Sequence, residues 1–160
     1  TSKQVQEDKN IFAQKISIGK KAKISEDFMI IARIESLILG KGVKDALDRA
    51  KKYVEAGADA IMIHSKSNTP KEIFDFAKKF RKNFHTIPLV SVPSSYNKVK
   101  ESELIKNGFN IVIYANHLLR AAYPAMQNAA NKILKYERSK ELDKQIISID
   151  KILDLIPGTK

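Results

Sequence analysis

No cysteine occurs among the 160 residues of this sequence. The chain therefore offers no thiol nucleophile, no thiolate ligand for a metal and no disulfide bond. Its apolar runs are too short to span a membrane, and the N-terminal residues lack the apolar stretch of a signal peptide. These absences favour a cytoplasmic protein with no membrane partner. The chain also begins with Thr1 instead of methionine, which indicates that it starts inside a longer protein.

A formal net charge of +11 raises the question of a nucleic-acid partner. The lysines, however, are spread along the predicted helices with acidic residues between them, and no stripe of basic and aromatic side chains occurs. This distribution is typical of solvated helix faces and predicts that nucleic acid is not a partner. A non-catalytic oligomerisation or nucleic-acid-binding module stays the alternative from another functional class.

Continuous apolar runs of strand length alternate with segments of helical periodicity. One helix is expected to begin with Thr69 as its N-cap, Pro70 as its first helical residue and Glu72 at position N3. The strands are predicted at residues 28–34, 58–63, 87–92 and 109–114, and the helices at 7–22, 43–54, 69–80, 100–106, 117–136 and 145–156.

The strand ends, near residues 34, 63, 92 and 114, recur at the spacing of βα repeats. We therefore predict an α/β fold of the (β/α)₈, or TIM-barrel, type, of which four parallel strands make one half. A half-barrel has two unpaired sheet edges and an open core. It should therefore associate with another copy of itself or with the other half of the barrel.

Polar side chains follow the first two predicted strands. Arg33 and Glu35 end the first strand, and His64 and Ser65 end the second. The carboxyl ends of parallel strands meet at one face of a barrel, so Arg33, Glu35 and His64 should converge on one pocket. A guanidinium and an imidazole there suit an anionic, phosphorylated substrate. A salt bridge between Arg33 and Glu35, and a structural role for His64, stay open as alternatives.

Three stretches carry a resemblance to a known family: Ile-Ile-Ala-Arg-Ile-Glu-Ser at residues 30–36, Gly-Lys-Gly-Val-Lys-Asp-Ala-Leu-Asp-Arg-Ala at 40–50 and Ala-Gly-Ala-Asp-Ala-Ile-Met-Ile-His-Ser-Lys at 56–66. Together with Tyr-Ala-Asn-His at 114–117 they resemble the phosphoenolpyruvate mutases of the isocitrate lyase/phosphoenolpyruvate mutase superfamily. The resemblance runs from about residue 4 to residue 156. It identifies the chain as the C-terminal half of such an enzyme, with the last four βα units and a C-terminal helix.

The resemblance implies a Mg²⁺-dependent mutase that interconverts phosphoenolpyruvate and phosphonopyruvate, with phosphonopyruvate hydrolase or a carbon–carbon lyase of the superfamily as alternatives. It implies that Arg33 and His64 are catalytic and bind the substrate, and that Ser65 also binds it. It implies that Glu35 and Asn116 contact these substrate-binding residues and hold them in place. The residues that hold the metal and the gating loop would precede Thr1, with no metal ligand in this chain. The chain alone should then be inactive.

The resemblance also predicts how the chain is divided and assembled. Residues 1–138 would form the half-barrel, and residues 139–160 would form a linker and a C-terminal helix. That helix is similar to one that family members exchange between neighbouring subunits, which implies a homodimer or homotetramer.

Overall fold

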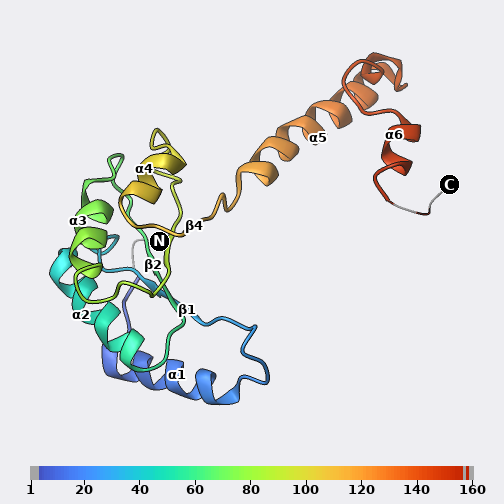
Figure 1. Ribbon diagram of the computed structural model, residues 1–160. Helices are drawn as coiled ribbons and strands as arrows, with labels where there is room; N and C mark the ends of the chain where they lie inside the picture. The colour runs from blue at the N-terminus through green and yellow to red at the C-terminus, as the bar shows by residue number, and fades with distance from the viewer. Residues whose placement is uncertain (1–3, 157, 159–160) are drawn as a thin grey trace. The chain divides into compact units, whose positions relative to one another are not determined.

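The structure, a computed structural model, describes residues 4–156 and 158 (Figure 1). By its internal contacts the chain forms two compact units, Thr1–Ala115 and Asn116–Lys160. The long helix over residues 117–136 therefore groups with the C-terminal segment. The predicted division into residues 1–138 and 139–160 stays a prediction.

The first unit is built on a four-stranded parallel sheet, which confirms the predicted α/β class. Its strands follow one another in chain order, β1 (Ile31–Ile34), β2 (Ala60–Ile63), β3 (Leu89–Ser91) and β4 (Ile111–Val112). Each strand is shorter than the predicted run, although some flanking residues still bond to the neighbouring strand, such as the Asn110 N–H to the Leu89 carbonyl at 2.9 Å. Before β1, the Asp59 carboxylate accepts the backbone N–H of Ile30 at 2.8 Å, while the Ile30 carbonyl accepts the backbone N–H of Asp59 at 2.9 Å.

Helix α1 (Lys9–Ala22) precedes β1, and α2 (Gly42–Glu55), α3 (Lys71–Phe80) and α4 (Glu101–Lys106) connect successive strands, all close to the predicted ranges. Helix α1 starts two residues later than predicted because Asp8 caps it. The Asp8 carboxylate accepts the backbone N–H groups of Asn10 (2.8 Å) and Ile11 (3.2 Å), and these bonds lower the pKa of Asp8.

The predicted start of α3 is wrong in detail. Pro70 occupies the N-cap position, and no side chain caps the helix. Glu72 does not close a capping box with Thr69, because its carboxylate accepts a hydrogen bond from the Ser65 hydroxyl at 2.7 Å instead. The contact with the preceding strand end thus takes the place of the expected local cap.

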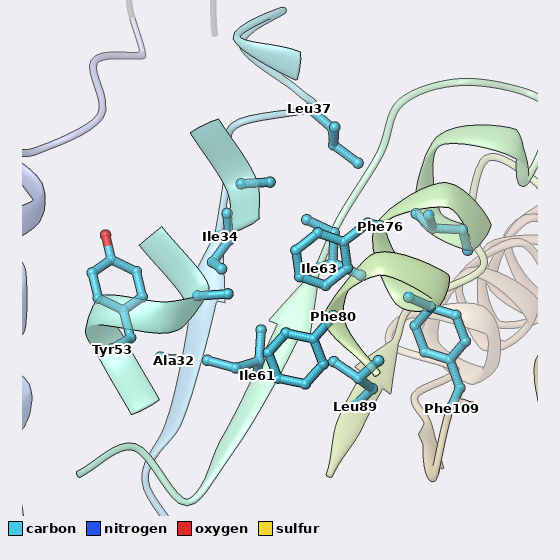
Figure 2. Close-up of a cluster of buried hydrophobic side chains, with 14 of the residues drawn as sticks. Ala32, Ile34, Leu37, Tyr53, Ile61, Ile63, Phe76, Phe80, Leu89 and Phe109 are labelled. Atoms are coloured by element: carbon cyan, nitrogen blue, oxygen red, sulfur yellow. The ribbon is translucent and has the colours of Figure 1, made fainter. Parts of the chain in front are cut away.

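The hydrophobic core lies on one face of the sheet, between the strands and the helices. Apolar residues of α1, α2, α3 and α4 all belong to one buried cluster with the same side of the strands. Figure 2 shows Ile61, Ile63 and Leu89 of the sheet meeting Phe76 and Phe80 of α3. Sequential parallel strands with all helices on one face are typical of a closed barrel wall, whereas a doubly wound sheet carries helices on both faces.

The second unit contains α5 (His117–Tyr136), a 3₁₀ turn (Lys140–Leu142) and α6 (Ile149–Leu153). The predicted helix over 145–156 is too long, because Gln145 and Ile146 donate their N–H groups to the carbonyl of Leu142 in a separate turn. Ser148 then caps α6 by accepting the N–H of Lys151. Among the described residues, no helix has the length and apolar character needed to cross a membrane.

We expect Phe76→Ala to lower the free energy of unfolding by about 3–5 kcal/mol, because it removes a ring that is fully buried between α3 and the sheet. Urea unfolding followed by circular dichroism measures this loss. Phe28→Ala is the matched control, since that ring is 64% exposed and its removal should change stability by about 0.5 kcal/mol or less. Equal losses in the two variants would contradict the core described here.

Candidate active site

Arg33, Glu35 and His64 lie on the face of the sheet that the helices leave open. Side chains alternate along a strand, and Ala32 and Ile34 point into the helix layer, so Arg33 and Glu35 point the other way. In the same way Ile61 and Ile63 face the helices, which turns His64 to the open face. The register pairs Ile34 with Ile63, so the next residues along, Glu35 and His64, are neighbours at the carboxyl ends of β1 and β2.

Arg33 and Glu35 form an ion pair through the guanidinium Nε and one carboxylate oxygen. The other carboxylate oxygen accepts a hydrogen bond from the Gln4 side chain at 3.3 Å. The Arg33 side chain is still 52% exposed, and its two terminal nitrogens have no hydrogen-bond partner within the described part of the chain. The ion pair therefore orients the guanidinium and leaves its outer fork able to bind an anion.

His64 is half-buried, and its Nδ1 atom is buried with no hydrogen-bond partner among the described residues. Burial lowers the pKa of His64, the charge of Arg33 lowers it further, and the charge of Glu35 opposes both. The imidazole is therefore neutral near pH 7, with one nitrogen able to donate and the other able to accept. Because the folded state binds this proton more weakly than the unfolded state, acidification through the ordinary histidine range reduces stability.

Ser65 lies on the other side of the chain from His64. It is fully buried, its hydroxyl donates to Glu72 at 2.7 Å, and the same oxygen accepts the N–H of Ser67 at 3.0 Å. The structure gives Ser65 an internal role at this strand end and does not bring it to the open face with Arg33 and His64. Its part in substrate binding stays a prediction.

Asn116 is exposed and stands directly before α5, where its carbonyl accepts the N–H of Arg120 at 3.0 Å. It belongs to the second compact unit, whereas Arg33, Glu35 and His64 belong to the first. The geometry therefore joins those three residues, and the supporting role of Asn116 stays a prediction.

A buried network that the sequence analysis missed lies behind Glu35. The Ser36 hydroxyl donates to Asp45 at 2.6 Å, and Asp45 also accepts from Arg49 at 3.1 Å. Arg49 is almost fully buried and also bonds the hydroxyl of Tyr53 at 3.0 Å. The signal in the sequence is a serine directly after a strand-end residue, followed by an acidic residue in the first turn of the next helix.

The described residues do not fit a magnesium site. They contain no group of three or more histidine, aspartate or glutamate side chains that could hold a metal ion. Glu35 is the carboxylate at the open face, and both of its oxygens are engaged, one by Arg33 and one by Gln4. The chemistry that these residues offer is therefore the binding of an anion by Arg33 and hydrogen bonding by a neutral His64.

We expect the two charged neighbours of His64 to move its pKa in opposite directions. Arg33→Gln removes a positive charge and should raise the pKa, whereas Glu35→Gln removes a negative charge and should lower it. Titration of the histidine Hε1 proton by NMR measures both, with the signal assigned through His64→Gln. Lys78→Gln, on the exposed side of α3, is the control and should leave the titration unchanged. A shift of the same sign in both site variants would contradict the proximity inferred here.

The phosphoenolpyruvate phosphomutase family matches residues 1–134. The chain is 39% identical to a phosphonopyruvate hydrolase of Variovorax sp. over 90% of its length, and 36% identical to a phosphoenolpyruvate phosphomutase of Tetrahymena pyriformis over 91%. These matches cover 49% and 48% of the two relatives, so the chain spans about half their length.

Among solved structures, the phosphoenolpyruvate phosphomutase of Streptomyces platensis subsp. rosaceus superposes with a TM-score of 0.89 at 37% identity. The match covers 96% of this chain and 52% of that one, as expected for four of eight βα units. A phosphonopyruvate hydrolase structure gives a TM-score of 0.86 at 38% identity, over 96% of this chain and 54% of that one. The fold is therefore half of a (β/α)₈ barrel, and the chain belongs to the phosphoenolpyruvate mutase family.

Proposed function

We propose that the protein containing this chain interconverts phosphoenolpyruvate and phosphonopyruvate. The observation that carries this proposal is the proximity, in a chain of this family, of a half-exposed Arg33 and a neutral His64 at adjacent strand ends, with no hydrogen-bond partner for the His64 Nδ1 atom among the described residues. A small molecule with a carboxylate and a phosphoryl group matches a guanidinium fork next to a hydrogen-bonding imidazole. Glu35 contributes by fixing the orientation of Arg33.

In the proposed reaction the phosphorus–oxygen bond of phosphoenolpyruvate breaks and a phosphorus–carbon bond to C3 forms, with no net change in composition. Such a transfer depends on positioning and on balancing the charge of the moving group. Arg33 supplies the positive charge, and His64 donates a hydrogen bond from a ring that stays uncharged near neutral pH. Mg²⁺ is part of the proposal as a cofactor, held outside the described residues of this chain. A phosphonopyruvate hydrolase has been solved with oxalate and Mg²⁺.

Phosphonopyruvate hydrolase is the second candidate, and the 39% identity to the Variovorax enzyme favours it specifically. In that reaction water takes the phosphoryl group, and the products are pyruvate and inorganic phosphate. Arg33 and His64 would serve both reactions equally, since each must stabilise the same departing phosphoryl group.

The basic surface supports this enzymatic proposal better than a nucleic-acid interface. Several lysines pair with acidic residues along the helices: Lys9 with Asp48, Lys15 with Glu7 and Lys79 with Asp75. A surface that neutralises phosphates needs unpaired cations gathered on one face. The pairs are instead distributed over α1, α2 and α3, as expected of solvated helix faces.

We expect the full-length protein, supplied with phosphonopyruvate and Mg²⁺, to form phosphoenolpyruvate, which ³¹P NMR distinguishes from inorganic phosphate. Arg33→Ala should lower kcat/KM by about 10²–10³-fold, because it removes the charge that balances the transferring group. Lys78→Ala, which removes an exposed cation on α3, is the matched control and should retain activity.

Formation of inorganic phosphate and pyruvate would contradict the mutase activity and support the hydrolase activity instead. An unchanged phosphonopyruvate signal would overturn both and leave a carbon–carbon lyase or a non-catalytic role. Near-normal turnover in Arg33→Ala would remove Arg33 from the site.

We also propose that the protein assembles as a homodimer or homotetramer through its C-terminal region. No residue of α5 is buried within the chain, although the helix carries large apolar side chains such as Leu118 (85% exposed) and Leu134 (78%). Apolar side chains gathered on a helix without a partner favour association. The proposed arrangement exchanges the C-terminal helix between neighbouring subunits.

We expect light scattering coupled to size-exclusion chromatography to give the mass of two or four subunits. Leu134→Glu should shift the mass toward the monomer, because a charge would be buried in the subunit contact. Gln127→Glu adds the same charge at an exposed polar position of α5 and is the matched control. A monomeric wild-type protein would contradict the proposal.

A further inference from the structure

Two serines occupy equivalent places in the first two βα units. Ser36 follows Glu35 after β1, and Ser65 follows His64 after β2. Both serines are fully buried. Each hydroxyl donates to a carboxylate in the first turn of the next helix, Ser36 to Asp45 of α2 at 2.6 Å and Ser65 to Glu72 of α3 at 2.7 Å. The same hydrogen-bond arrangement therefore occurs twice, once directly after Glu35 and once directly after His64.

The alternation of side chains explains what this arrangement does. At the end of β2, Ile63 points into the helix layer, His64 points to the open face and Ser65 turns back into the helix layer. A bond from Ser65 to α3 therefore fixes the chain on both sides of His64. The Ser65 oxygen also accepts the N–H of Ser67 at 3.0 Å, so the same hydroxyl shapes the turn that follows.

The His64 ring needs such support, because its Nδ1 atom has no hydrogen bond of its own among the described residues. A side chain without hydrogen bonds is held only by packing and by the backbone from which it projects. The hydrogen bond from the Ser65 hydroxyl to the Glu72 carboxylate is also stronger than one to a neutral acceptor, because a charged acceptor makes a hydrogen bond shorter and more favourable.

We propose that the Ser65–Glu72 hydrogen bond is a positioning latch, which holds the His64 imidazole in its half-buried place at the open face. The Ser36–Asp45 bond acts as its counterpart for Glu35. Ser65 and Glu72 are then positioning residues, which act through His64 without touching the substrate. The proposal rests on the proposed function for the use of His64, whereas the latch itself exists in the ligand-free protein and is tested there.

The test follows the His64 Hε1 signal by NMR through a pH titration of the full-length protein. The groups whose charges act on this ring are Arg33 of β1 and Glu35, which directly follows β1, and neither is changed. In Ser65→Ala and in Glu72→Ala the released ring should move toward solvent. The pKa of His64 should then rise toward that of an ordinary histidine, because burial is the main cause that lowers it.

Two further variants separate a latch from a general loss of stability. Glu72→Gln keeps a carbonyl that can accept the serine hydroxyl but loses the charge near the start of α3, so it should retain the wild-type titration. Ser91→Ala removes another buried hydroxyl, which bonds Tyr96 at 3.0 Å in the third βα unit. It should lower the melting temperature and leave the titration of His64 unchanged.

An unchanged His64 titration in folded Ser65→Ala and Glu72→Ala would overturn the latch, and so would an equal shift in Ser91→Ala. If Ser65→Ala does not fold, Glu72→Ala decides, because residue 72 is exposed and its truncation creates no cavity. Failure of the proposed function has a different signature. It appears as the absence of turnover on phosphonopyruvate, whatever the titration of His64 shows.

Discussion

The structure depends on one constraint, namely that all helices of the first unit pack on a single face of a parallel sheet. Strand residues alternate between two faces, so each strand gives half of its side chains to the core and half to the opposite face. The core side is filled by the aromatic rings of α3 and the aliphatic residues of β1 to β3. The other side is therefore where polar groups can stand without disturbing the packing, and Arg33, Glu35 and His64 are found there.

The same constraint sets the electrostatics of the site. Arg33 would be costly to bury alone, and its pairing with Glu35 offsets part of that cost while leaving half of the side chain exposed. His64 lies next to this pair but carries no charge of its own near neutral pH, because burial and Arg33 together outweigh the attraction of Glu35. The site therefore combines a fixed cation with a neutral hydrogen-bonding ring, an arrangement that favours anions over cations.

Much of this could be predicted from the sequence, because strong local patterns determine it. The apolar runs that end at Ile34 and Ile63 and the periodicity of α2 and α3 located the elements. The rule that the carboxyl ends of parallel strands meet at one face then placed Arg33 and His64 at the same edge. The boundaries were less predictable, since they depend on contacts between distant residues. The Asp59 carboxylate bonds the N–H of Ile30 just before β1, and Ser65 draws Glu72 away from the capping role that its spacing suggested.

The extent of α6 and the role of Ser65 show why some features escape a sequence pattern. Apolar residues recur at helical spacing from Ile146 to Ile156. The backbone N–H groups of residues 145 and 146 nevertheless bond the carbonyl of Leu142 in a turn, so this segment does not form one continuous helix. The family resemblance implied that Ser65 binds the substrate, which remains a prediction. Neighbouring residues of an extended chain point in opposite directions, and that same alternation rule places Ser65 in the helix layer.

The difference between a mutase and a hydrolase rests on access of water to the phosphoryl group. Arg33 is half-exposed, so the described residues alone do not exclude water from the position that its guanidinium fork would hold. A phosphoryl group in transit reacts with whichever acceptor reaches it, and only a closed, dry site commits it to the enolate carbon. The chain is 36% identical to a phosphoenolpyruvate phosphomutase and 39% identical to a phosphonopyruvate hydrolase, so overall identity does not separate the two activities. The choice between the two reactions should therefore be made by the groups that cover the open face, and Arg33 and His64 should serve both.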